Sequence, residues 1–93
     1  MDKTLDQLRK EIDQIDQQMI QLLAARLRVV KKVGEYKKER NLPALDQNRW
    51  QEVLANRLKQ AKELNLNENF ITETYELIHQ EALKIENFNV KPI

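Results

Sequence analysis

The first 40 residues carry apolar side chains at alternating steps of three and four, a spacing typical of a helix that buries one face. The seam comprises Leu5, Leu8, Ile12, Ile15, Met19, Leu22, Arg26, Val29, Val33 and Tyr36. Thr4 and Gln7 have the spacing of a capping box before it, and Asn41 and Pro43 supply a stop signal after it. The pattern therefore predicts one helix over residues 4–40, with a heptad seam along its whole length.

Two shorter amphipathic segments follow the long one. The first is expected over residues 47–64, and Asn65 suits the left-handed position at its end. The second is expected over residues 68–87, with Asn67 as its N-cap.

No strand-like alternation, internal repeat or linker interrupts these segments. The pattern thus predicts an all-α fold with three helices, forming a single domain over residues 1–93. The tail NFNVKPI is expected to be frayed or loosely docked.

The length of the first helix indicates a second chain. A helix over residues 4–40 is about 55 Å long at about 1.5 Å per residue. A compact chain of 93 residues has a radius of gyration of about 12 Å, and hence a diameter of roughly 32 Å. Much of the seam must therefore project beyond its own chain and needs cover. The simplest cover is a second copy, so we expect an interlocked helical homodimer.

Arg26 is a cation on this otherwise apolar seam, and Lys37 follows it 11 residues later. Eleven residues turn a helix only about 20° beyond three full turns, so both cations share a face, about 16 Å apart along the axis. Val30 and Val33 lie between them. Arg9 is about 25 Å from Arg26 along the same helix. It reaches the same ligand only from a partner chain that runs the opposite way.

The other two helices place further charges at or near apolar stripes. Asp46 and Arg49 lie at the start of the second helix, and Glu86 extends the apolar stripe of the third, so it is expected to lean inward. Cations outnumber acids at these positions, and buried cations are costly unless they are paired. The pattern predicts an anionic ligand, and a small dicarboxylate suits it because arginine binds carboxylates through two hydrogen bonds.

Composition narrows the alternatives. The net charge of +1 argues against nucleic-acid binding, and a chain with no cysteine and one histidine argues against a zinc site. No apolar run approaches the roughly 20 residues of a membrane span, and no apolar signal segment precedes the first helix. We therefore expect a cytoplasmic location and no membrane, nucleic-acid or metal partner.

Three segments together resemble the all-α (AroQ-type) chorismate mutases: LRKEIDQIDQQMIQLLAARLRVVKKVGEYKK, the spacing P-x-x-D-x-x-R, and NENFITETYELIHQEALKIE. The resemblance covers nearly the whole chain. It implies an isomerase without a cofactor that converts chorismate to prephenate by a [3,3] shift, on the shikimate route to aromatic amino acids. It also implies a homodimer whose two active sites are each built from both chains.

The resemblance assigns roles to five matching residues. Arg26 and Lys37 match the pair that binds the substrate carboxylates, and Lys37 also faces the ether oxygen. Arg9 matches the arginine donated by the partner chain. Asp46 and Arg49 match positions that complete the pocket.

Three further pocket positions depart from many relatives. Trp50 stands where a glutamate often accepts from the substrate hydroxyl, and Ala82 where a serine often helps to bind a carboxylate. Glu86 stands where bacterial relatives often have a glutamine that donates to the ether oxygen. Glu86 can donate only when protonated, so activity is expected to fall as rising pH deprotonates it. The first two departures, at Trp50 and Ala82, leave isochorismate–pyruvate lyase activity, or a mutase of a related analogue, as alternatives.

Simpler interpretations exist for the same residues. Arg26 could be a polar seam residue that fixes register in a non-catalytic dimerisation module. Trp50 could be a core anchor, and Glu86 could be solvated near its helix end. His79 is interpreted as a partly buried helix residue without a role.

Overall fold

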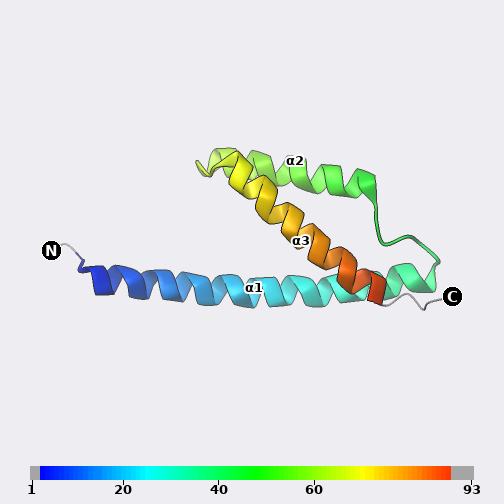
Figure 1. Ribbon diagram of the computed structural model, residues 1–93, viewed down its shortest axis with the longest axis horizontal. Coiled ribbons are helices and arrows are strands. Elements are labelled where there is room, and N and C mark those ends of the chain that lie inside the picture. The colour runs from blue at the N-terminus through cyan, green and yellow to red at the C-terminus, as the bar shows by residue number, and fades with distance from the viewer. Residues whose placement is uncertain (1–2, 89–93) are drawn as a thin grey trace.

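The chain forms three helices in a computed structural model that describes residues 3–88: α1 (Leu5–Glu39), α2 (Gln47–Glu63) and α3 (Glu68–Phe88) (Figure 1). No strand occurs within the described residues. Each predicted helix boundary lies within one residue of the observed one, so the all-α prediction is confirmed. Of the tail predicted to fray, residues 87 and 88 are helical, and residues 89–93 lie outside the described part of the chain.

The helix ends use the local hydrogen bonds that the sequence predicts. The Thr4 side chain accepts from the Gln7 backbone N–H at 3.2 Å, and the Gln7 side chain accepts from the Thr4 N–H at 2.8 Å. The Asn67 side chain accepts from the Phe70 N–H at 2.8 Å at the start of α3. Asn65 has a φ of 57°, the left-handed conformation that asparagine tolerates better than most residues. These caps fix where the helices begin and end.

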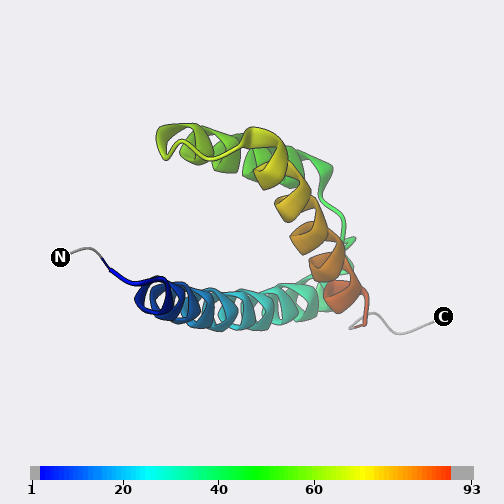
Figure 2. The same ribbon diagram turned by 60° about the vertical axis from the view of Figure 1, so that its left-hand side comes forward.

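The third helix connects the other two. It packs against both α1 and α2, whereas the backbones of α1 and α2 do not come close to each other within residues 3–88. Figure 2 shows the resulting open shape, with α1 and α2 on opposite sides and α3 running between them. The N-terminal part of α1 extends beyond the other helices (Figure 1). The radius of gyration is 17.2 Å, against about 12 Å for a compact chain of this length. The predicted projection of the long helix is confirmed.

Most of the seam of α1 is uncovered in the single chain. Nine of its apolar or aromatic residues are at least 40% exposed: Leu5, Leu8, Ile12, Ile15, Met19, Leu22, Val29, Val33 and Tyr36. Within the described residues, the buried hydrophobic side chains are Val53, Ala61 and Ala82 alone. So large an exposed apolar stripe marks an interaction surface. No helix within residues 3–88 is both long and apolar enough to cross a membrane.

Candidate functional site

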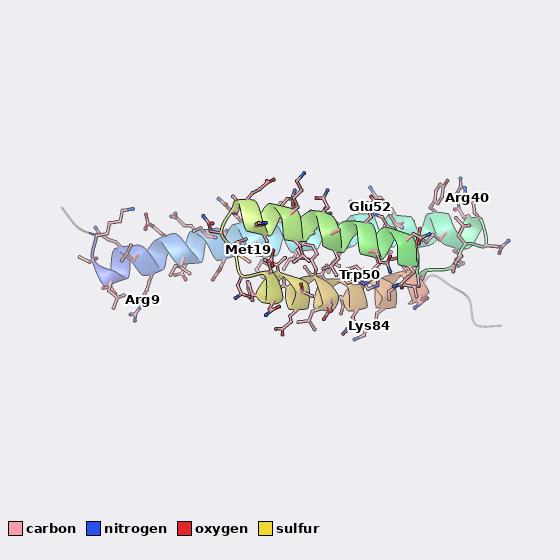
Figure 3. All side chains as sticks on the ribbon, turned by 90° about the horizontal axis from the view of Figure 1, so that it is seen from above. Arg9, Met19, Arg40, Trp50, Glu52 and Lys84 are labelled. Atoms are coloured by element: carbon pink, nitrogen blue, oxygen red, sulfur yellow. The ribbon has the colours of Figure 1, made fainter. Side chains whose placement is uncertain are left out.

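A pocket of about 180 Å³ lies where the C-terminal half of α1, the start of α2 and the C-terminal half of α3 approach one another. Figure 3 shows Trp50 between α2 and α3. The lining residues come from all three helices and the α1–α2 loop: Arg26, Val30, Val33, Lys37, Ala44, Asp46, Arg49, Trp50, Val53, His79, Ala82 and Glu86. Residues far apart in the sequence thus form one pocket that is lined by both charged and apolar side chains.

The first helix contributes Arg26, Lys37 and the two valines between them, as its turn angle predicts. The Nη1 atom of Arg26 is buried and has no hydrogen-bond partner among the described residues. A buried donor without a partner costs about 1–3 kcal/mol, and more when it is charged. The structure therefore holds a cationic donor ready for a ligand acceptor in this pocket.

Lys37 and Glu86 form a mostly buried ion pair. The Lys37 Nζ atom lies 2.7 Å from Glu86 Oε1, and the two side chains are 20% and 10% exposed. The ammonium also donates to the Ala44 carbonyl oxygen at 2.6 Å, which ties the loop to α1. Because an ammonium has three donors, one of them stays available for a ligand. The expectation that Glu86 leans inward is confirmed, and its interpretation as a solvated helix-end residue is wrong.

Two charged residues stand at the rim of the pocket, where α2 begins. The Asp46 side chain accepts from the Arg49 backbone N–H at 3.1 Å, so Asp46 is the N-cap of α2. The guanidinium of Arg49 donates to Glu52 at 2.5 Å, in an ion pair whose side chains are 58% and 69% exposed. Exposed ion pairs contribute about 0–1 kcal/mol. Arg49 can therefore turn from Glu52 toward an anion in the pocket at little cost.

One wall of the pocket is an aromatic stack. The rings of Trp50 and His79 lie 4.1 Å apart between centroids and within 6° of parallel. Burial lowers the pKa of His79, and the charges of Arg26 and Lys37 lower it further, whereas Glu86 raises it. Since the ordinary pKa of histidine is about 6.5, the imidazole is neutral at pH 7.

His79 was missed as a pocket residue in the sequence analysis, which gave it no role. A signal was present, because His79 precedes Ala82 by three positions and Glu86 by seven, which places all three on one helix face. Ala82 itself is 7% exposed and lines the pocket. Ala44 and Val53 were also missed, because no pattern in the sequence shows where the loop and the start of α2 lie relative to α1.

Arg9 is the one predicted site residue that this chain does not bring to the pocket. It is exposed on the N-terminal part of α1, and Figure 3 shows it far from Trp50, beyond the ends of α2 and α3. The other seven predicted residues all line the pocket. A role for Arg9 therefore requires another chain and stays a prediction.

Comparisons with known proteins place this geometry in context. The family described as chorismate mutase type II matches residues 8–87. The chain is 37% identical over 75 residues to a bifunctional chorismate mutase/prephenate dehydratase of Buchnera aphidicola, covering 81% of this chain and 20% of that protein. It is 31% identical over 86 residues to a chorismate mutase of Methanocaldococcus jannaschii, covering 90% and 87%. A 4-amino-4-deoxychorismate mutase of Streptomyces pristinaespiralis is 28% identical over 83 residues, covering 89% and 64%. The chain thus spans about a fifth of the length of the bifunctional relative and most of the length of the archaeal one.

Proposed function

The chain belongs to the chorismate mutase type II family, and from that premise we propose that it rearranges chorismate to prephenate in aromatic amino acid biosynthesis. The observation that carries the proposal is the buried, unpaired Nη1 donor of Arg26 in a pocket that also holds the Lys37–Glu86 pair. A dianionic substrate supplies the acceptor that this guanidinium lacks.

The proposed reaction needs no covalent catalysis by the protein. The [3,3] shift breaks the ether C–O bond and forms a C–C bond in one concerted step, without a nucleophile or a proton relay. The protein needs to hold the compact conformer of the substrate, and to stabilise the negative charge that develops on the ether oxygen. In this proposal Arg26 and Arg49 bind carboxylates, whereas Lys37 and Glu86 face the ether oxygen. The apolar side chains of Val30 and Val33 support the ring between them.

We also propose an interlocked homodimer in which each site receives Arg9 from the partner. The exposed seam of α1 and its extension beyond α2 and α3 support this arrangement, because a second copy of the same helix has the matching seam. An antiparallel partner helix spans the roughly 25 Å that separate Arg9 from Arg26. Light scattering should give twice the mass of one chain; the mass of a single chain would overturn the shared site. The cytoplasmic location stays a prediction.

A direct assay tests the activity. Purified protein should consume chorismate, measured by the loss of its ultraviolet absorbance, and should release prephenate. The same protein is incubated with isochorismate, with pyruvate as the product measured, and with 4-amino-4-deoxychorismate. Faster turnover of either would favour a lyase or an amino-analogue mutase, an alternative that the Streptomyces relative supports. Turnover of none would favour a non-catalytic dimerisation module.

Replacing Glu86 with glutamine is expected to remove the pH dependence of the reaction on the alkaline side. In the free protein Glu86 accepts from Lys37, and a carboxyl group donates to the ether oxygen only when it is protonated. A glutamine amide donates at every pH. We expect kcat of the wild type to fall as the pH rises and kcat of Glu86→Gln to stay level.

The measurement is kcat at saturating chorismate from pH 5 to 9 for both proteins. Circular dichroism at each pH ensures that both remain helical. Parallel profiles for the two proteins would show that Glu86 has no role in delivering a proton to the ether oxygen.

A further inference from the structure

The aromatic wall of the pocket carries hydrogen-bonding groups that none of the described residues uses. Among residues 3–88, no group forms a hydrogen bond with the imidazole of His79 or with the indole N–H of Trp50. Both side chains line the pocket, and neither has a buried polar atom without a partner. These polar atoms are therefore neither buried nor paired within residues 3–88, and a ligand in the pocket that the two rings line can meet them.

The rest of the pocket leaves one substrate group without a suitable partner. Chorismate has two carboxylates, an ether oxygen and a ring hydroxyl. The carboxylates and the ether oxygen need donors, and the arginines and Lys37 supply donors only. A hydroxyl that donates needs an acceptor, and three lining side chains can accept: Asp46, Glu86 and His79.

The two carboxylates are poor candidates for this acceptor. Asp46 caps α2, and Glu86 is paired with Lys37. Asp46 also carries negative charge, which repels a dianionic substrate at close range, and the proposed function places Glu86 at the ether oxygen. The neutral imidazole of His79 offers one acceptor nitrogen without such repulsion.

We infer that His79, held in place by its stack on Trp50, accepts the hydrogen bond from the ring hydroxyl of the substrate and so sets specificity at that position. The inference rests on the proposed function, since it assumes a substrate of the chorismate class. Parallel stacking at 4.1 Å holds the imidazole in one plane. The lone pair of its acceptor nitrogen is therefore held in that same plane. An acceptor fixed in advance loses little entropy when the substrate binds. The lowered pKa of His79 keeps this acceptor available at neutral pH.

The test compares two substrates across three proteins. The substrates are chorismate and the analogue in which hydrogen replaces the ring hydroxyl, and the proteins are the wild type, His79→Leu and His79→Asn. For His79→Leu we expect kcat/KM on chorismate to fall about tenfold, mostly through KM, the size of one neutral hydrogen bond. The wild type should prefer chorismate over the analogue by a similar factor, and His79→Leu should treat both substrates alike. His79→Asn should recover part of the preference, because its amide oxygen accepts.

Gln80→Leu serves as the matched control, since Gln80 is exposed beside His79 on the same helix. It should keep the wild-type preference. Wild-type protein inactive on chorismate would remove the proposed function itself. Active protein in which His79→Leu keeps the preference for chorismate would overturn the inference and leave that function intact. An equal fall in kcat/KM for His79→Leu and His79→Asn, on both substrates, would also overturn the inference. The imidazole would then act through packing alone.

Discussion

Replacing Lys37 with alanine is expected to lower kcat for chorismate rearrangement by about 100- to 1,000-fold, the usual cost of removing one donor aimed at developing negative charge. The ammonium sits between Glu86 Oε1 and the Ala44 carbonyl oxygen, at 2.7 and 2.6 Å. These contacts aim it into the pocket before any substrate arrives, so it needs no rearrangement during the reaction. Because the charge on the ether oxygen grows in the transition state, kcat should fall more than KM rises.

Lys38→Ala is the matched control. Lys38 is the next residue on α1, carries the same charge and is exposed, and it does not line the pocket. Its loss should change kcat by less than about twofold, since a surface charge substitution away from such sites has little effect. Circular dichroism and light scattering should give unchanged helicity and mass for both variants. A Lys37→Ala protein as fast as Lys38→Ala would show that Lys37 serves the loop contact and not the reaction.

The helices could be predicted from the sequence because their determinants are local. The three-and-four spacing of apolar residues, the capping box at Thr4 and the asparagines at helix ends act within a few residues of chain. The shared face of Arg26 and Lys37 follows in the same way from the turn angle of one helix. For these features the observed boundaries differ from the predicted ones by at most one residue.

Contacts between helices could be predicted only in part. The pattern of the third helix indicated that Glu86 faces inward, whereas its proximity to Lys37, which lies 49 positions away, followed only from the family resemblance. The Trp50–His79 stack depends on how α3 crosses between α1 and α2, and helix periodicity does not determine that crossing. The sequence shows which pocket residues are charged. The tertiary arrangement decides which of these charged groups have a partner within the chain and which, like Arg26, do not.

The extended N-terminal part of α1 bears on how many cations the pocket can receive. α1 extends far beyond the part of it that α3 covers (Figure 1), and Arg9 lies on that extension (Figure 3). Within the described residues, one chain provides a pocket with one buried guanidinium nitrogen that lacks a partner, although the proposed substrate has two carboxylates. Arg49 can supply a second cation from the rim, and a partner's α1 can supply a third.

Mixing the Arg9→Ala and Arg26→Ala variants is expected to restore about a quarter of wild-type activity if each active site takes residues from both chains. Arg9→Ala and Arg26→Ala should each lower kcat/KM by about 100-fold or more, since each removes one of the cations proposed to bind the two substrate carboxylates. In a mixed dimer, one site combines the intact Arg26 of one chain with the intact Arg9 of the other. Random pairing of equal amounts makes half of the dimers mixed, each with one of its two sites intact, hence about a quarter of all sites. The two chains are unfolded together, refolded and assayed for chorismate loss.

A mixture of Arg26→Ala with Lys37→Ala is the matched control for this experiment. Both residues lie on the same part of α1 and line the same pocket, so every site in a mixed dimer lacks one of them. This mixture should stay as inactive as its components, and light scattering should show dimers in both mixtures. If the Arg9→Ala and Arg26→Ala mixture also stayed inactive, each site would draw its cations from one chain. The extended N-terminal part of α1 would then serve assembly alone.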